Sequence, residues 1–296
     1  MTSPIKKAII PVAGYGTRFL PVTKAMPKEM LPIVDTPVIQ YIVEEAVRSG
    51  ITDIIFVTGR GKRVIEDHFD TSFELERTLV EHEKRDLLAL VQSVSRLARF
   101  VYVRQPMPRG DGDAILRAAH LIAPGEPFAV LFGDDLIDAP KPALAELAAA
   151  FTRTGAPTVA LTRVPRKELH HYGTVIGHET RAGVWAIDRF VEKPRDTRGI
   201  PVPLAVIGRY ILTPDILGEI AGAHRKSRGR GELRIGDGIA RYVAKGRSAY
   251  GVEVHGTRYD CGSRVGYLAA NIAFARKRPE LRRELAKFLS NGKRTR

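Results

Sequence analysis

Apolar residues occur in short runs that alternate with longer stretches of helical spacing through the first 160 residues. A short apolar run predicts a buried strand, and apolar residues three or four apart predict one face of a helix. This alternation predicts an α/β fold in which helices cover a largely parallel sheet. The predicted strands are residues 8–12, 53–58, 100–103, 128–132 and 158–161. The predicted helices are residues 37–49, with Pro37 at the first helical position, 78–97, 114–121 and 142–152.

The pattern changes beyond residue 160. Shorter strand-like runs at residues 173–177, 184–192 and 204–212 predict hairpins that extend the sheet with mixed strand directions. Residues 250–254 form another predicted strand, and residues 264–277 a predicted helix. We therefore expect a Rossmann-like, mixed, mainly parallel sheet flanked by helices, with a C-terminal helical appendage.

The chain has neither a low-complexity linker nor an internal repeat that would divide it. We expect one main domain at residues 1–262, with a first half of about 1–150 and a second half of about 151–262. Residues 263–296 are predicted to form a helical segment and a basic tail. Helical spacing resumes after Pro279 and stops at Gly292, which predicts a helix that docks on the main domain through its apolar stripe.

Composition excludes several classes of protein. The 296 residues are 44% apolar, which allows a large core, but no run reaches the length of a membrane span. The N-terminus lacks the apolar segment of a signal peptide. The single cysteine, Cys261, excludes an internal disulfide and a multi-cysteine zinc site. We expect a soluble, cytoplasmic protein.

The net charge of +14 raises the question of nucleic-acid binding. Half of that charge lies in the last 21 residues, and residues 225–231 form a second basic, glycine-rich stretch. The chain has no aromatic-rich RNA motif and no zinc finger. We therefore favour a solvated basic face over a nucleic-acid site.

Candidate chemistry begins directly after the first predicted strand. Gly14 and Gly16 would let backbone amides approach an anion, and Arg18, Lys24 and Lys28 follow them in one loop. The spacing matches neither the dinucleotide fingerprint nor a P-loop, and prolines in the loop predict an extended, kinked path. Either a polyphosphate cradle or a basic surface loop fits this pattern.

Acidic residues follow two other predicted strands. Asp134 and Asp135 end the strand at 128–132, and Asp260 lies at a second strand exit. Because ligands of open parallel sheets bind at the carboxyl ends of strands, Asp134 and Asp260 could hold Mg²⁺ together with phosphate oxygens. An ordinary turn after a strand is the alternative.

Glu192 and Lys193 end another predicted strand, directly before Pro194. A carboxylate suits paired sugar hydroxyls, and an ammonium suits a phosphate. Neighbouring strand residues point to opposite faces, so the two side chains would serve different groups unless Pro194 distorts the strand end. On this pattern alone, a surface ion pair is the preferred interpretation.

Taken together, the motifs resemble those of the bacterial UTP–glucose-1-phosphate uridylyltransferases, in the sugar-phosphate nucleotidyltransferase superfamily. The resemblance runs from about residue 6 to residue 280. It rests on Gly14-Tyr15-Gly16-Thr17-Arg18, Pro27-Lys28-Glu29-Met30-Leu31-Pro32, Ile39-Gln40-Tyr41, Val57-Thr58-Gly59-Arg60, Ile65-Glu66-Asp67-His68-Phe69-Asp70, Val103-Arg104-Gln105, Gly133-Asp134-Asp135, Val191-Glu192-Lys193-Pro194, Gly208-Arg209-Tyr210 and Arg258-Tyr259-Asp260-Cys261-Gly262.

The resemblance implies a nucleotidyltransferase fold, UTP and glucose 1-phosphate as substrates, and UDP-glucose and pyrophosphate as products. It implies Mg²⁺ held by Asp134 and Asp260, and a homodimer or homotetramer. Arg18, Lys28 and Lys193 would be the catalytic residues that contact phosphates. The nucleotide would be held by Ala13, Gly14, Gly16, Thr17, Glu29, Gln105 and Gly110, and the sugar by Gly173, Glu192, Val206 and Gly208.

Three departures from the family pattern bear on specificity. The family usually has Gly-Leu-Gly-His where this chain has Gly110 to Asp113, so acids at 111 and 113 either cap the helix predicted at 114 or alter contacts to base or sugar. Val202 and Pro203 replace Ser-Asn, and Arg234 replaces a glutamine. Another sugar 1-phosphate or dTTP is therefore the first alternative. A non-catalytic regulatory or nucleic-acid-binding homologue is the alternative of another class.

Overall fold

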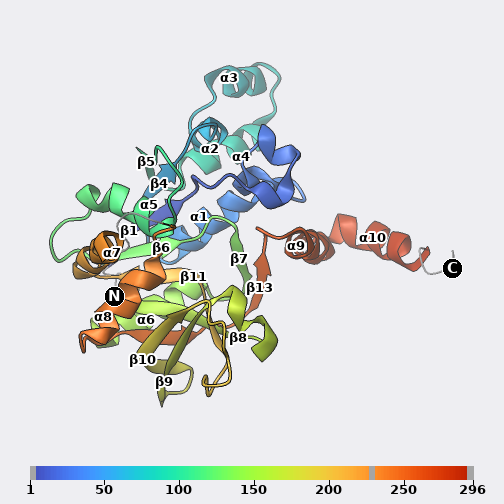
Figure 1. The fold of residues 1–296 in the computed structure, drawn as a ribbon. Helices are drawn as coiled ribbons and strands as arrows, with labels where there is room; N and C mark the ends of the chain where they lie inside the picture. The colour runs from blue at the N-terminus through green and yellow to red at the C-terminus, as the bar shows by residue number, and fades with distance from the viewer. Residues whose placement is uncertain (1–4, 227–230, 292–296) are drawn as a thin grey trace.

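A computed structural model gives the structure of residues 5–226 and 231–291 (Figure 1). Most of the predicted basic loop at 225–231, and the end of the basic tail, lie outside the described residues. The strands are β1 (Lys7–Pro11), β2 (Pro32–Ile33), β3 (Thr36–Pro37), β4 (Asp53–Thr58), β5 (Arg99–Arg104), β6 (Phe128–Leu131), β7 (Asp135–Asp138), β8 (Thr158–Arg163), β9 (Gly173–Arg181), β10 (Val184–Glu192), β11 (Leu204–Leu212), β12 (Tyr250–Glu253) and β13 (Thr257–Asp260). The α-helices are α1 (Val38–Arg48), α2 (Arg63–Phe69), α3 (Phe73–Glu81), α4 (Arg85–Ser95), α5 (Asp111–Ala118), α6 (Ala143–Thr154), α7 (Asp215–Lys226), α8 (Ile235–Ala244), α9 (Arg264–Lys277) and α10 (Pro279–Asn291). The 3₁₀ helices are η1 (Thr17–Phe19), η2 (Val22–Lys24), η3 (Lys28–Met30), η4 (Ala119–Leu121) and η5 (Arg166–His171).

One nine-stranded sheet runs through both predicted halves of the main domain, in the order β5-β4-β1-β6-β11-β8-β12-β10-β9. The first four strands are parallel to one another, as the alternating pattern predicts, and β12 is parallel to β8. Strand β11 is antiparallel to both β6 and β8, so it joins the parallel part to the hairpin part. The mixed α/β fold is confirmed, whereas the predicted domain limits stay a prediction.

Both faces are buried at the centre of the sheet, which explains why β1, β4, β6 and β11 are continuous apolar runs rather than alternating ones. On β1, Ala8 and Ile10 enter one core cluster, and Ile9 enters the other. Helices α1, α2, α6 and α9 cover the first face, and α5, α7 and α8 cover the second. None of the helices in the described part of the chain combines the length and apolar character needed to cross a membrane.

Several local predictions were wrong. The helix predicted at 78–97 is two helices, α3 and α4, because the chain turns at Glu83, whose φ is 55°. The loop after β1 is not extended throughout, since η1, η2 and η3 each make one turn within it. Pro37 lies in β3, directly before α1, rather than at the first helical position. Helix α10 projects beyond α9, away from the body, instead of docking on it (Figure 1).

Candidate active site

Two adjoining pockets lie beyond the carboxyl ends of β1 and β6, with volumes of about 480 and 660 Å³. All the predicted site residues line one pocket or both. The smaller, which we call the nucleotide pocket, contains Ala13, Gly14, Gly16, Thr17, Arg18, Lys28, Glu29, Gln105, Gly110 and Asp134. The larger, which we call the sugar pocket, contains Arg18, Asp134, Gly173, Glu192, Lys193, Val206, Gly208 and Asp260. Arg18 and Asp134 belong to both pockets, so they lie where the two meet.

The glycine-rich loop is held in place from two directions. Gly16 has φ 64°, and its carbonyl oxygen accepts a hydrogen bond of 2.8 Å from Thr23 Oγ1. The carbonyl of Arg18 accepts a hydrogen bond of 2.9 Å from Arg264 Nε at the start of α9. Because the backbone is tied at these points, the Arg18 guanidinium is presented at the junction of the pockets without an ion-pair partner among the described residues.

Lys28 forms an ion pair with Asp134 in this structure. Burial lowers the pKa of Lys28, but the carboxylates of Asp134 and Glu29 outweigh burial and raise it overall. Burial raises the pKa of Asp134, and Lys28 outweighs that effect and lowers it. The pair is therefore fully ionised at neutral pH, and Lys28 supplies a fixed positive charge beside the aspartate.

The predicted metal ligands lie close together. A Cβ built on Gly262 would lie within 3.0 Å of both Asp134 Oδ2 and Asp260 Oδ1, so only a glycine leaves the space between these oxygens open. Burial, and then the neighbouring Asp134, raise the pKa of Asp260. No group of three or more protein ligands is present among the described residues. Two hard oxygen donors that repel each other fit Mg²⁺, whose other ligands are typically water and substrate phosphate.

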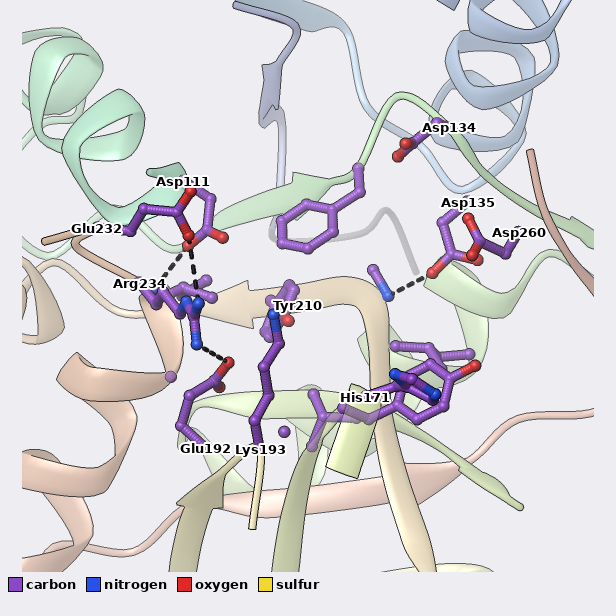
Figure 2. Close-up of a pocket in the computed structure, with 18 of the residues that line it drawn as sticks. Asp111, Asp134, Asp135, His171, Glu192, Lys193, Tyr210, Glu232, Arg234 and Asp260 are labelled. Atoms are coloured by element: carbon purple, nitrogen blue, oxygen red, sulfur yellow. Dashed lines mark hydrogen bonds and ion pairs between the residues drawn. The ribbon is translucent and has the colours of Figure 1, made fainter. Parts of the chain in front are cut away.

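The end of β10 turns both Glu192 and Lys193 toward the sugar pocket. Lys193 has φ 44°, which breaks the alternation expected for neighbouring strand residues. Glu192 does form an ion pair, but its partner is Arg234 Nη1, at 3.0 Å, rather than Lys193. Figure 2 shows the Lys193 side chain reaching into the pocket, between Glu192 and the aspartates on the opposite side. A surface pair of Glu192 with Lys193 is thus excluded.

Glycines let the backbone of the sugar pocket pack closely. A Cβ on Gly173 would lie 2.7 Å from the Phe190 ring, and one on Gly208 would lie 2.8 Å from Phe132 Cβ. The Gly208 amide donates a hydrogen bond of 2.8 Å to Asp135 Oδ2. These contacts leave no room for side chains at positions 173 and 208.

Sequence reasoning missed an ion pair that braces the sugar pocket. Asp135 Oδ1 accepts a hydrogen bond of 2.6 Å from Arg258 Nε, and Arg258 Nη1 donates to the Tyr172 hydroxyl at 3.2 Å. Burial lowers the pKa of Arg258, but Asp135 outweighs it and raises the pKa. Both residues belong to the quoted motifs, Asp135 beside Asp134 and Arg258 beside Asp260, so adjacency to a predicted ligand was the available signal.

A second missed partner lies under the nucleotide pocket. Lys62, 6% exposed, donates to Glu29 Oε2 at 2.8 Å, and Glu29 is 1% exposed. Burial raises the pKa of Glu29, against the lowering effect of Lys62. Glu29 lines the pocket, but the Lys62 ammonium already neutralises part of its negative charge. Nothing in the sequence around Lys62 indicated this contact.

The two acids that depart from the family pattern do not cap the helix that contains them, α5. Helix α5 starts at Asp111, three residues earlier than predicted, and has no side-chain cap. Asp111 Oδ1 accepts a hydrogen bond of 2.6 Å from the amide of Ile235, the first residue of α8. Asp113 Oδ2 accepts one of 2.7 Å from Gln105 Nε2. Asp111 lines both pockets. Asp113 contacts Gln105, which is predicted to bind the nucleotide.

Comparison with known proteins identifies the family of this chain. Residues 7–277 match the family model of nucleotidyl transferases. The chain is 46% identical over 288 residues to UTP–glucose-1-phosphate uridylyltransferase 1 of Staphylococcus saprophyticus, covering 97% of this chain and 98% of that protein. It is 46% identical over 285 residues to the corresponding enzyme of Staphylococcus haemolyticus, covering 96% and 97%.

Solved structures give the same result. A UDP-glucose pyrophosphorylase complexed with UDP-glucose matches with a TM-score of 0.81 and 41% identity, over 93% of this chain and all of that one. A UTP-bound enzyme of the same type from Acinetobacter baumannii matches with a TM-score of 0.88 and 35% identity, over 96% and 98%. The chain therefore belongs to the nucleotidyl transferase family, and within it to the UTP–glucose-1-phosphate uridylyltransferases.

Proposed function

We propose that this protein transfers the uridylyl group of UTP to glucose 1-phosphate, giving UDP-glucose and pyrophosphate. The observation that carries the proposal is the pair of pockets that meet at Arg18 and Asp134. A nucleotide in one pocket and a sugar phosphate in the other would bring their phosphates together at that junction. The relatives named for this reaction, and the structures solved with UTP and with UDP-glucose, support the same function.

The main barrier is repulsion between two anions. Two unit charges about 5 Å apart, at an effective dielectric near 20, repel by roughly 3 kcal/mol, and a triphosphate facing a sugar phosphate has several such pairs. Arg18, Lys28 and Lys193 supply fixed positive charge around the junction. Because these cations are preorganised, they stabilise the charge of the transition state and hold the attacking oxygen in line with the departing pyrophosphate.

Mg²⁺ held by Asp134 and Asp260 would neutralise phosphate charge and orient the phosphate oxygens. The glucose phosphate needs no general base, since the second pKa of a phosphate monoester is about 6 and the nucleophile is already ionised. His170 and His171 line the exposed side of the sugar pocket, where we expect contacts with sugar or solvent rather than proton transfer.

Asp134→Asn tests the metal assignment. We expect the Mg²⁺ concentration that gives half-maximal rate to rise by about tenfold or more, because one of two carboxylate ligands becomes neutral. Asp138→Asn, at the other end of β7, is the matched control, since Asp138 pairs with Lys277 outside both pockets. An unchanged Mg²⁺ titration in Asp134→Asn would reject the ligand assignment.

The reaction itself is tested by incubating the protein with UTP, glucose 1-phosphate and Mg²⁺ and measuring UDP-glucose and pyrophosphate. A panel with dTTP and with other hexose 1-phosphates tests the first alternative, because Arg234 introduces a cation beside Glu192 that the family pattern lacks. Formation of no sugar nucleotide from any pair would refute the proposal. RNA binding that persists at high salt without pyrophosphate release would favour the nucleic-acid-binding alternative. A homodimeric or homotetrameric state and a cytoplasmic location stay predictions.

A further inference from the structure

The side-chain amide of Gln105 is held by two hydrogen-bond acceptors. Gln105 is 3% exposed and lines the nucleotide pocket. Its Nε2 donates to Asp113 Oδ2 at 2.7 Å and to the Gly110 carbonyl at 3.1 Å. Asp113 is itself 7% exposed, and its other oxygen accepts from Arg117 Nη2 at 3.3 Å. Both N–H groups of Gln105 are therefore used within the protein.

This arrangement fixes which end of the amide faces the ligand. A carboxylate and a backbone carbonyl can only accept hydrogen bonds, so the amide nitrogen must point toward them and the amide oxygen must point away. Gln105 Oε1 has no partner among the described residues, and it is not sealed from solvent. It is thus the only polar atom of the Gln105 side chain that is available to a molecule in the nucleotide pocket.

An oxygen in this position would discriminate between pyrimidine bases that turn ring position 3 toward it. Uracil carries an N–H at ring position 3, which can donate to Gln105 Oε1, whereas cytosine carries an unprotonated nitrogen there, which would face the oxygen lone pair against lone pair. A buried acceptor selects strongly between two ligands when one of them donates a hydrogen bond to it and the other faces it with a second acceptor. Thymine has the same N–H as uracil, so the device does not separate UTP from dTTP.

We propose that Asp113 is a positioning residue that locks the Gln105 amide with its oxygen toward the nucleobase, and so makes the pocket select UTP over CTP. The inference rests on the proposed function, because it takes the nucleotide pocket as the site of the base. Asp113 replaces the histidine usual in the family pattern. A neutral histidine ring can donate or accept according to its tautomer, whereas a carboxylate can only accept. An aspartate therefore holds one amide orientation more strictly.

Asp113→Asn tests the proposal with minimal change of shape. An asparagine can donate to Gln105 Oε1 as well as accept from Nε2, so the inverted amide that would accept CTP is then opposed by the Gly110 carbonyl but no longer by a carboxylate. Binding of UTP and CTP is measured by calorimetry in the absence of sugar phosphate, and kcat/KM is then measured for both nucleotides. We expect the UTP-to-CTP preference to fall by about tenfold or more in both measurements, with CTP binding more tightly than to the unmodified protein.

Two further variants keep the test specific. Arg117→Ala removes the other partner of Asp113 but not the Gln105 contact, so we expect the preference to stay within about twofold. In a protein that already carries Gln105→Leu, adding Asp113→Asn should leave the preference unchanged, since the two effects act through one side chain. Circular dichroism and thermal unfolding establish that each variant is folded.

The outcomes separate this inference from the function proposed above. An unchanged preference in Asp113→Asn, or a loss of UTP binding without any gain for CTP, overturns the role of Asp113. The role of Asp113 is also overturned if Asp113→Asn lowers the UTP-to-CTP preference equally in a protein that already carries Gln105→Leu. A protein that selects UTP by calorimetry, and loses that selection in Asp113→Asn, supports the inference even if no UDP-glucose forms. That result would refute the proposed reaction and would still support selection of the nucleobase through Asp113.

Discussion

At the scale of single residues, Lys193 has a backbone conformation that is rare for a residue with a side chain. Its φ of 44° lies in the left-handed region, which costs of order 1–3 kcal/mol in a non-glycine residue. The conformation is held by a hydrogen bond of 3.1 Å from its amide to the carbonyl of Tyr172. Without this turn, Lys193 would point to the opposite face from Glu192.

Lys193→Ala tests the role of this ammonium group. We expect turnover at saturating substrate to fall by about 10²-fold or more, because one preorganised charge contact to the transition state is lost. Arg195→Ala is the matched control, since Arg195 is exposed and lines neither pocket. Steady-state kinetics measure both variants. Near-normal turnover in Lys193→Ala would make Lys193 a bystander.

Asp111 makes the unfolding free energy depend on pH. Burial raises its pKa from 3.8 to about 6, and Glu192 adds to that, while the bond from the Ile235 amide and the charge of Arg234 oppose it. Because the folded-state pKa is the higher one, the folded protein binds this proton more tightly than the unfolded chain. The stabilising contribution of Asp111 to the free energy of unfolding is therefore fully present below about pH 4 and is lost as the pH rises through 6.

Asp111→Asn removes this titration and keeps an oxygen that can accept from the Ile235 amide. We expect the variant to gain stability relative to the unmodified protein as the pH rises from 4 to 7, by about 1–3 kcal/mol in total. Urea unfolding at several pH values measures the difference. A difference that does not change with pH would mean that Asp111 titrates normally in the folded protein.

Site residues that belong to dense motifs could be predicted from the sequence, but the residues that pair with them from distant positions could not. Lys28, Asp134 and Lys193 could be assigned because each lies in a recognisable motif at a strand exit or in the first loop. Lys62 lies 33 positions from Glu29, and such a pair depends on how the chain folds rather than on local spacing. The same holds for Arg258, which lies 123 positions from Asp135.

At the scale of elements, one buried ion pair joins helix α1 to the sheet. Arg209 on β11 is 0% exposed and forms hydrogen bonds of 3.0 and 2.7 Å to the two carboxylate oxygens of Glu45. Glu45 also accepts from the amide of Leu144 in α6, and Arg209 donates to the carbonyl of Asp135 at 2.7 Å. These contacts fix α1, α6 and β7 relative to one another directly below the sugar pocket.

Glu45→Gln leaves the Arg209 charge buried without a carboxylate. We expect a loss of about 3–5 kcal/mol of unfolding free energy, measured by urea denaturation, because removal of one partner leaves the other charge uncompensated. Glu44→Gln is the control, since the one hydrogen-bond partner of the Glu44 carboxylate in the described part of the chain is Gln40, on the same helix, and it should cost less than about 0.5 kcal/mol. Equal midpoints for the two variants would contradict the structural role of the pair.

The spacing of apolar residues was enough to predict that most helices and strands exist and which of the two they are. It was not enough to predict where each one begins and ends. The apolar stripe of residues 78–97 continues in phase across α3 and α4, so its periodicity indicated one helix. The chain reverses at residues 81–86, all charged or histidine, where no side chain anchors a continuous helix to the core. A polar run longer than one helical turn was therefore the overlooked indication of a break.

At the scale of the whole molecule, helix α9 ties the end of the described chain to its beginning. Tyr267 donates to the Pro32 carbonyl at 2.7 Å, and Asn271 Oδ1 accepts from the Val34 amide at 2.9 Å. The ring of Phe19 packs edge-on against Tyr267, with centroids 5.6 Å apart. Together with the bond from Arg264 to the Arg18 carbonyl, these contacts make α9 a support for the glycine-rich loop.

Two truncations test this support and the predicted limit at residue 262. A chain that ends after Arg278 lacks α10, and we expect its turnover to stay within about twofold, because the main packing partner of α10 is α9. A chain that ends after Gly262 also lacks α9, and we expect turnover to fall by about 10²-fold, since the Arg18 loop loses its anchor. Full activity in the shorter chain would show that residues 1–262 suffice.

The support from α9 also sets an order of events during translation. The residues that hold Arg18, Pro32 and Val34 are made 235 to 246 positions after them. A nascent chain can assemble the parallel strands while it is still attached to the ribosome, but the contacts that hold its first loop require α9 to have emerged. The support that α9 gives to the Arg18 loop therefore becomes available only after residues 264–271 have been made.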